Sequence, residues 1–257
     1  MNLITSRDNP LLKELRRLSQ DSTAYRKLGK VWLEGDHLCR AALARGVQPE
    51  QAVFAESQWQ SAPQAWQNAA PRNTVVPDAL FADISGLESP ARMGFVMALP
   101  EATRIQPNAS TVVLDRVQDA GNVGSILRSA AAFGFTQVVA LKGTAALWSP
   151  KVLHAGMGAH FGLHLVDGVT YEALQDLQVP WLTTDVHQGH FLHQLVAQRQ
   201  LPMPCAWLLG HEGQGVSPEL AAKAQLSVRI AQPGGEESLN VSVAAAICLH
   251  ASAAAQL

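Results

Sequence analysis

The chain has 257 residues, of which 47% are hydrophobic and 16% are charged, and its formal net charge is −2 at pH 7. This composition is typical of an ordered globular protein with room for two modest domains, and it excludes an intrinsically disordered chain. The charge is unevenly distributed, because residues 1–45 hold nine lysines and arginines against five acidic residues. We therefore expect a basic surface in the first part of the chain.

The sequence indicates a protein of the cytoplasm with no membrane segment. The first ten residues contain charged residues and a proline but no apolar run, so we expect no signal peptide. The longest apolar stretch, 241–255, is too short to span a bilayer. Cys39, Cys205 and Cys248 are odd in number and lack metal-ligand spacing, which predicts reduced thiols.

The first hundred residues predict a small α/β domain. Asp8 or Asn9 would cap a helix with Pro10 in its first turn, whose leucines fall on one side and whose basic residues fall largely on the other. A second helix is expected at 36–45, and strands are expected at 31–35, 51–55, 73–76 and 94–99. The proline-containing polar stretch 101–110 has the composition of a linker, so we expect one domain over 1–100 and another over 111–257.

From residue 111 the pattern alternates between apolar strands and helices. Strands are expected at 111–115, 136–141, 162–166, 180–183, 206–210 and 226–230, and helices at about 123–133, 149–157, 171–177 and 217–224. This alternation predicts a parallel sheet covered on both faces. Ligands of such open sheets bind beyond the carboxyl ends of the strands, which directs attention to the loops there.

The loop within 115–129 follows a strand and enters a helix. It has only Gly121 and Gly124 in place of a G-x-G-x-x-G pattern, so it gives little support to a nicotinamide or flavin site. Asn122 at its mouth and Arg128 two turns into the helix would both be able to face the strand ends. A plain surface arginine is the alternative for Arg128.

The loop within 208–220 has three glycines in six residues, from Gly210 to Gly215. It lacks the Lys-Ser/Thr pair of a nucleoside triphosphatase, and its glycines would instead let the main chain approach a flat or cationic ligand. Glu212 would supply a negative charge. A tight turn capped by Ser217 is the alternative.

The stretch 228–249 places a polar cluster at the start of a long apolar helix. A turn at 233–235 is followed by Glu237, Ser238 and Asn240, where unpaired backbone N–H groups would be available to a ligand. An ordinary capped core helix is the alternative. His187, His190 and His193 recur every third residue, but they lack acidic or cysteine partners other than Asp185, so we expect no metal site.

Three segments resemble the ordered motifs of the SpoU (TrmH) family of RNA ribose 2′-O-methyltransferases, in the SPOUT superfamily. They are DRVQDAGNVGSILR at 115–128, LGHEGQGVS at 209–217 and ESLNVSVAA at 237–245. The stretches 148–152 and 157–159 are similar to the family's connecting helix, and 6–10 with 33–38 resemble the small substrate-binding domain that many members carry. Two positions depart from the family pattern, namely His211 and Gly156, and both are expected beside the cofactor pocket.

The resemblance implies a parallel-sheet SPOUT domain with a carboxyl-terminal trefoil knot, preceded by a small α/β RNA-binding domain. It also implies a homodimer through the methyltransferase domain and S-adenosyl-L-methionine as cofactor. By motif position the cofactor would contact Leu209, Gly210, Glu212, Gly213, Ile230, Gln232, Ser238 and Leu239. The glycine loop and the polar helix start had already suggested a close backbone approach at two of these segments.

The reaction implied by the resemblance requires an aligned ribose hydroxyl and stabilisation of the negative charge that develops on its oxygen. Arg128 is expected to stabilise that charge, because a guanidinium remains protonated and is poorly suited to act as a base. Asn122, Ser238 and Asn240 are expected to orient the ribose, and Glu237 to assist. RNA would contact the basic residues Arg7, Lys13, Arg16, Arg17, Arg26 and Lys27.

The two-domain organisation favours ribosomal RNA over transfer RNA as the substrate. Two other interpretations stay open from the sequence: a non-catalytic RNA-binding protein of the same fold, and a nucleotide-dependent α/β enzyme unrelated to RNA. The sequence does not identify the methylated nucleotide.

Overall fold

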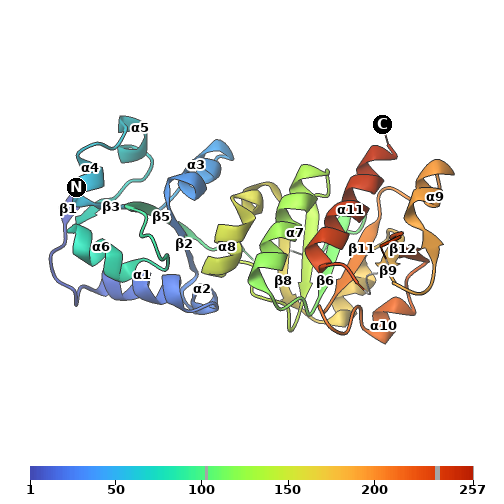
Figure 1. Ribbon diagram of the computed structural model, residues 1–257. Helices are drawn as coiled ribbons and strands as arrows, with labels where there is room; N and C mark the ends of the chain where they lie inside the picture. The colour runs from blue at the N-terminus through green and yellow to red at the C-terminus, as the bar shows by residue number, and fades with distance from the viewer. Residues whose placement is uncertain (102–103, 235–237, 257) are drawn as a thin grey trace. The chain divides into compact units, whose positions relative to one another are not determined.

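The computed structural model describes residues 1–101, 104–234 and 238–256, and the chain folds into two compact units (Figure 1). Unit 1 comprises Met1–Glu101 and Trp148–Phe161, and unit 2 comprises Ala102–Leu147 and Gly162–Leu257. The first break lies next to the expected linker. In contrast, the segment Trp148–Phe161 was expected in the second domain and instead packs in unit 1.

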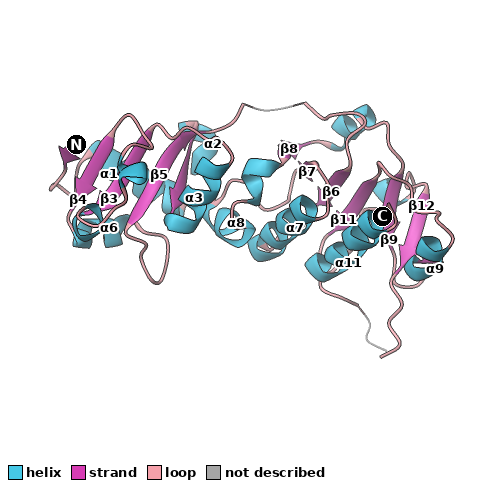
Figure 2. Cartoon of the chain, turned by 90° about the horizontal axis from the view of Figure 1, so that it is seen from above, coloured by secondary structure: helices cyan, strands magenta, loops and turns pink. Residues whose placement is uncertain are grey.

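Unit 1 contains a five-stranded mixed sheet in the order β1-β4-β3-β5-β2. Its strands are β1 (Asn2–Leu3), β2 (Lys30–Glu34), β3 (Gln51–Ala55), β4 (Asn73–Val76) and β5 (Met93–Ala98). Its helices are α1 (Pro10–Gln20), α2 (Ala24–Leu28), α3 (Asp36–Ala44), α4 (Glu56–Trp59), α5 (Gln64–Gln67), α6 (Asp78–Ile84) and α8 (Pro150–Gly156), followed by the 3-10 turn η1 (Ala159–Gly162), whose last residue belongs to unit 2. Figure 2 shows the helices and strands from a second direction.

Local chemistry explains how unit 1 is assembled. Asn9 caps α1 by accepting a hydrogen bond from the Leu11 backbone N–H, and Leu12, Leu15 and Leu18 are buried beneath the helix. The Glu34 carboxylate is buried at the end of β2, where it accepts hydrogen bonds from the Ser85 hydroxyl and the Gly86 N–H. These contacts satisfy a charge that would be costly to bury alone.

The departure at Gly156 also has a local explanation in unit 1. A Cβ at this position would lie 2.5 Å from Cε1 of the His160 ring, which therefore takes the space that a side chain would need. Because His160 is buried, a larger residue at 156 would force the ring to move.

Unit 2 contains a seven-stranded sheet in the order β10-β12-β9-β11-β6-β7-β8, and every pairing in it is parallel. Its strands are β6 (Thr111–Asp115), β7 (Gln137–Leu141), β8 (His164–Val169), β9 (Trp181–Thr184), β10 (His190–Phe191), β11 (Ala206–Gly210) and β12 (Leu226–Arg229). Its helices are α7 (Ala120–Ala132), the 3-10 helix η2 (Tyr171–Asp176), α9 (Leu192–Ala197), α10 (Pro218–Ala221) and α11 (Val241–Ala254). The prediction of an α/β fold with a parallel sheet is confirmed.

Successive residues of the central strands face opposite layers of unit 2. Leu208 of β11 belongs to the apolar cluster that includes Leu174 of η2 and Leu220 of α10. The neighbouring Trp207 faces the other side, where its indole Nε1 donates a 3.0 Å hydrogen bond to Ser252 of α11. On that side α7 and α11 lie next to each other (Figure 1). This packing brings the first turns of both helices to the carboxyl edge of the sheet.

Several short elements differ from the expectations. The segment expected to form a helix at 171–177 is the 3-10 helix η2, and the helix expected at 217–224 is limited to Pro218–Ala221. The sequence also gave no indication of β1, β10 or α9. In the part of the chain that the structure describes, no helix has the length and apolarity to cross a membrane.

Candidate active site

The candidate site begins at the first turn of α7, which follows β6 directly. Asp119 is the N-cap, because its carboxylate accepts a 2.7 Å hydrogen bond from the Asn122 backbone N–H. This cap starts the helix at Ala120, three residues before the expected start, and places the Asn122 side chain at the strand ends. Asp119 was missed in the sequence, although an aspartate before a helical segment is a recognisable capping signal.

A chain of hydrogen bonds joins Asn122 to the two other loops. The Asn122 amide Nδ2 donates to Glu212 Oε1 at 3.1 Å, and its Oδ1 accepts from Asn240 Nδ2 at 3.0 Å. The three residues come from positions up to 118 apart in sequence. The structure therefore brings two of the predicted catalytic amides into direct contact, and each partner fixes which way the Asn122 amide points.

Glu212 is oriented toward the start of α7. Besides the Asn122 amide, its carboxylate accepts backbone hydrogen bonds from Gln118 at 3.2 Å and Asp119 at 3.1 Å. Burial raises the pKa of the Glu212 carboxyl, but the hydrogen bonds from Asp119, Asn122 and Gln118 outweigh it and hold the pKa below its ordinary value. The Glu212 carboxylate therefore accepts hydrogen bonds from backbone N–H groups at the start of α7, where a negative charge is favourable. The sequence did not predict this role.

Asn240 is the N-cap of α11. Its Oδ1 accepts from the Ser242 backbone N–H at 2.8 Å, from the Ser242 hydroxyl at 2.6 Å and from the Val243 N–H at 3.4 Å. With Oδ1 used in capping, Nδ2 is directed to Asn122. Ser238 and Leu239 precede the cap and are exposed. Glu237, expected to assist catalysis, lies outside the described residues.

The loop after β11 is tightly closed on itself. His211 and Gly215 exchange two backbone hydrogen bonds of 3.0 and 2.8 Å, and the Gly213 N–H donates to the His211 ring Nδ1 at 3.0 Å. A Cβ on Gly210 would lie 2.0 Å from the carbonyl carbon of Gly215, so no side chain fits there. The glycines therefore serve the close approach of two backbone segments, and His211 stabilises the turn.

The remaining residues expected to bind a cofactor differ in accessibility. Leu209 is buried in β11, whereas Ile230 is partly buried and Gly213 is exposed. Gln232 has a buried Oε1 to which no described residue donates a hydrogen bond. A buried acceptor of this kind is costly to leave unpaired, and it is available to a ligand that donates a hydrogen bond.

Arg128 is not part of the hydrogen-bonded group. It lies on α7 six residues after Asn122, which is about 9 Å further along the helix axis and about 120° around it. Its side chain is exposed, and among the described residues no hydrogen bond or ion pair with it is formed. The structure therefore joins Asn122, Glu212 and Asn240 by hydrogen bonds within one chain, and among the described residues Arg128 forms no hydrogen bond with them.

In unit 1 the predicted RNA contacts fall into two groups. Arg16 has only 19% of its side chain exposed, and it bonds Asp83 at 2.6 Å and the Arg7 carbonyl at 2.8 Å. Arg7 also pairs with Asp83, although its side chain is 72% exposed. Exposed residues outside this ion-pair cluster are Lys13, Arg17, Arg26 and Lys27. Arg16 thus has a structural function that its sequence position did not indicate.

The histidine series gives no metal-binding cluster. Among residues 1–101, 104–234 and 238–256, no group of three or more histidine, cysteine, aspartate or glutamate side chains is arranged to hold a metal ion. His193 instead lies on α9, with its ring beside Phe191 at a centroid distance of 5.5 Å.

Comparison with known proteins places this geometry in context. Residues 109–250 match the SpoU rRNA Methylase family, and residues 9–94 match the MRM3-like substrate binding domain. The chain is 28% identical to the 23S rRNA (guanosine(2553)-2′-O)-methyltransferase RlmP of Bacillus subtilis, over 97% of this chain and 98% of that protein. A crystal structure of an RNA 2′-O ribose methyltransferase is 28% identical, with a TM-score of 0.79 over 99% of both chains.

A crystal structure of an rRNA methyltransferase from Sinorhizobium meliloti with bound S-adenosylmethionine is 24% identical and has a TM-score of 0.83, over 100% of this chain and 98% of that one. That likeness concerns the fold alone. The family match covers more than half of the sequence and includes every segment that forms the hydrogen-bonded group. The chain therefore belongs to the SpoU rRNA methylase family.

Proposed function

We propose that the protein transfers a methyl group from S-adenosyl-L-methionine to a ribose 2′-hydroxyl of ribosomal RNA. The observation that carries this proposal is the contact between Asn122 and Asn240, two amides from distant motifs of the family that meet at the carboxyl edge of the sheet. Family membership and the near full-length similarity to an rRNA 2′-O-methyltransferase support the reaction type.

The residues present fit a bound S-adenosylmethionine. Gly210 allows close backbone packing, the buried Gln232 Oε1 offers an acceptor, and the exposed Leu239 side chain is apolar and able to contact an adenine ring. Ile230 would contact the cofactor through its main chain. With Leu209, Gly213 and Ser238 they form the proposed cofactor-binding set. When bound, the cofactor supplies a methyl group already activated by a sulfonium sulfur.

Glu212 has a different part in this proposal from the one predicted. Its carboxylate is already engaged by three N–H donors at the start of α7, so we assign it to holding Asn122 in place. Asn122, Asn240 and Ser238 would then orient the ribose through hydrogen bonds. Glu237 remains a proposed assistant at the same turn.

Arg128 is proposed to stabilise the negative charge that develops on the attacking oxygen. A guanidinium provides a fixed positive charge and several donors, which suits an oxyanion better than it suits proton abstraction. Arg128→Ala should abolish methyl transfer while leaving S-adenosylmethionine binding measurable by calorimetry, and Arg128→Lys, which keeps the charge, should retain part of the activity. Wild-type turnover in Arg128→Ala would overturn this role.

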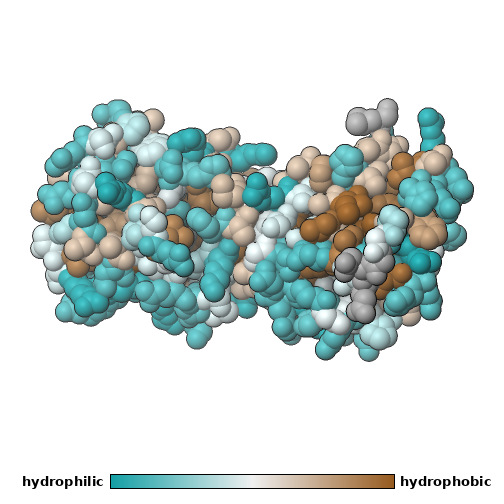
Figure 3. Space-filling view, viewed as in Figure 1, coloured by the Kyte–Doolittle hydropathy of each residue, from teal (hydrophilic) through white to brown (hydrophobic). Residues whose placement is uncertain are grey.

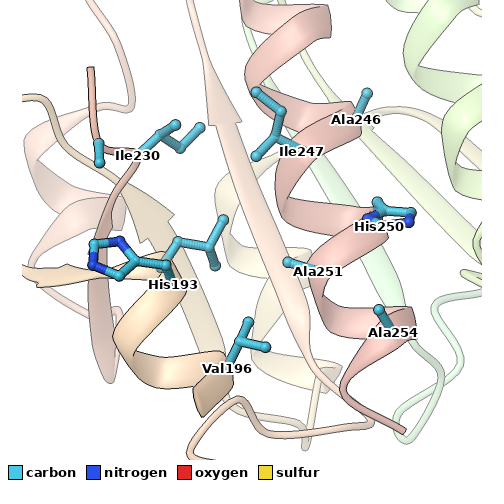
Figure 4. A pocket seen from close by; sticks show the side chains of 10 residues that line it. His193, Val196, Ile230, Ala246, Ile247, His250, Ala251 and Ala254 are labelled. Carbon is cyan, nitrogen blue, oxygen red and sulfur yellow. The ribbon is translucent and has the colours of Figure 1, made fainter. Parts of the chain in front are cut away.

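A homodimer through unit 2 would cover an apolar surface that one chain leaves open. α11 is apolar around most of its circumference, yet Val243 is 48% exposed and Ile247 is 37% exposed. Figure 3 shows hydrophobic residues gathered there. A groove of about 720 Å³ lies between α9 and α11. Ile230 and Ile247 face each other across it (Figure 4).

This groove does not suit the cofactor itself, because its lining is largely apolar whereas S-adenosylmethionine carries three charged groups. A second copy of the chain is therefore the proposed occupant. Ile247→Glu should convert a dimer into a monomer in sedimentation equilibrium, with the circular dichroism spectrum unchanged. A wild-type chain that sediments as a monomer at micromolar concentration would exclude this assembly.

Three further features belong to the proposal. A trefoil knot is supported by the strand order, since β12 lies beyond β9 while α11 returns to pack on β11. Unit 1 is proposed to bind RNA through Lys13, Arg17, Arg26 and Lys27, aided by Arg7 and Arg16. A cytoplasmic site of action is supported by three free cysteines, all of them buried. Burial raises the pKa of the Cys205 thiol to about 12, for example.

Mapping ribose methylation in RNA from cells with and without the protein tests the choice of substrate. We expect a methylated position in ribosomal RNA that disappears with the protein. Loss of a ribose methyl from transfer RNA alone would assign the enzyme to that substrate instead, and no change in either RNA would contradict the proposed activity.

A further inference from the structure

A buried carboxylate at the end of β6 holds the far end of the glycine loop. Asp115 is 3% exposed and is paired in register with Gly210 of β11. Its Oδ2 accepts a 2.6 Å hydrogen bond from the Ser217 backbone N–H, and its Oδ1 accepts from Arg116 Nε at 3.0 Å. The loop 211–217 thus begins beside Asp115 and returns to the same carboxylate.

The adjacent Arg116 reaches the middle of that loop. Its Nη1 donates to Gln214 Oε1 at 3.1 Å, while its Nε donates to Asp115. The Arg116 backbone N–H donates to the Thr144 hydroxyl at 3.1 Å, which anchors the residue to the turn after β7. With a further bond from Nη2 to Asp115 Oδ2 at 3.4 Å, one guanidinium therefore connects the sheet end to an exposed loop side chain.

The backbone of Arg116 has an unusual conformation, which its side-chain contacts help to maintain. Its φ is +61°, in the left-handed region, which any residue with a Cβ adopts at an energetic cost and which glycine adopts freely. Arginine at such a position is explained by the contacts of its side chain with Asp115 and Gln214. On the other side of the loop, Glu212 is fixed to the start of α7. The loop is consequently held on two sides.

We propose that Arg116 and Asp115 are positioning residues that hold the loop 211–217 in the shape required to bind S-adenosylmethionine. This inference rests on the proposed function, since the same loop supplies Gly213 and follows Gly210, both members of the proposed cofactor-binding set. Neither side chain needs to touch the cofactor. The pair acts through Gln214 and Ser217. Its loss would weaken cofactor binding but would leave the rate of methyl transfer from the saturated enzyme almost unchanged.

The test uses the full-length protein and S-adenosylmethionine itself. Arg116→Gly removes all three side-chain bonds, two to Asp115 and one to Gln214, and relieves the left-handed strain, so we expect its melting temperature to stay close to that of the wild type. Calorimetry should show cofactor affinity reduced about tenfold, in line with the loss of a charge-assisted hydrogen bond. KM for the cofactor should rise similarly while kcat at saturation changes little.

Gln214→Ala provides a second variant in which folding is not at risk, because Gln214 is exposed. It should weaken cofactor binding severalfold. Lys142→Ala is the matched control, since it removes one exposed positive charge directly after β7 and leaves the Arg116 bonds intact. Its affinity should equal that of the wild type.

The outcomes separate this inference from the function on which it rests. Wild-type protein that fails to bind S-adenosylmethionine would defeat the proposed function. Wild-type protein that binds it, together with Arg116→Gly and Gln214→Ala variants that bind within twofold of the wild type, would overturn the positioning role alone. If Arg116→Gly has a clearly lower melting temperature than the wild type, the Gln214→Ala variant alone tests the positioning role. An affinity for S-adenosylmethionine within twofold of the wild type would then overturn it.

Discussion

Replacing Glu212 with glutamine tests how strongly the hydrogen-bonded group depends on its anionic member. The wild-type carboxylate accepts three hydrogen bonds, two on Oε1 and one on Oε2. A glutamine side chain has one acceptor oxygen, so its amide NH₂ would face either the Gln118 N–H or the pair formed by Asp119 and Asn122. In the better orientation Glu212→Gln therefore loses one hydrogen bond and gains an unfavourable donor–donor contact.

The magnitude follows from this count. Hydrogen bonds to charged groups contribute about 1.5–3 kcal/mol, and the exposure of Glu212 places this one at the lower end. A loss of about 1.5 kcal/mol in the anchoring of residue 212 to the start of α7, which in turn holds the Asn122 amide, corresponds to a decrease of up to roughly tenfold in kcat/KM for methyl transfer. Glu212→Ala, which removes all three bonds, should lose more activity.

The assay is transfer of radiolabelled methyl groups to ribosomal RNA under single-turnover conditions, combined with a thermal melt of each variant. Glu219→Gln is the matched control, because this exposed carboxylate lies in the next helix and forms no ion pair among the described residues. If Glu212→Gln transfers methyl groups as fast as the wild type, then Asn122 does not depend on Glu212 and the reasoning is refuted.

Three other predictions concern binding, packing and pH. Lys13→Ala combined with Arg17→Ala should lower the slope of log affinity for RNA against log salt by about 1.5, measured by filter binding, and an unchanged slope would place the RNA elsewhere. Ser252→Ala leaves the buried Trp207 N–H without its acceptor and should reduce the free energy of unfolding by about 1–3 kcal/mol in urea titrations, whereas no change would mean that the indole finds another partner. Burial raises the pKa of Asp115, but hydrogen bonds from Arg116 and Ser217 outweigh this effect and lower the pKa in the folded state below its ordinary value of 3.8. The ionised carboxylate therefore stabilises the fold fully above pH 3.8. This stabilisation should disappear as the pH falls through the lower pKa of the folded state. Urea titrations between pH 2 and 6 should therefore show a smaller acid loss of stability in Asp115→Asn, and parallel curves would contradict the shift.

The central strands were predictable because their residues carry the signal themselves. β6 and β11 agree with the expected 111–115 and 206–210, and both are apolar runs bounded by polar loops. α9 is short, and its sequence has no sustained periodicity that would separate it from a loop, whereas the helix expected at 171–177 forms as the 3-10 helix η2. The contacts of the segment around α8 group it with unit 1, and packing partners of this kind are not encoded in local patterns.

The candidate site was predictable in its residues but not in its connections. Asn122 and Asn240 were identified from motifs, and the structure shows them in contact. Glu212 was expected to face a cofactor, whereas its hydrogen bonds are with the start of α7, a segment 90 or more residues earlier. The left-handed backbone of Arg116 also depends on tertiary contacts, so no spacing in the sequence indicates it.

The most direct test of the account is to locate the transferred methyl group by mass spectrometry. Ribosomal RNA from cells that lack the protein would be incubated with purified protein and S-adenosylmethionine carrying a deuterated methyl group, and then digested to nucleosides. We predict deuterium in a single nucleoside, retained on the ribose fragment after loss of the base, and absent with Arg128→Ala. Deuterium on the base fragment, or none in the RNA, would contradict ribose methylation by this site.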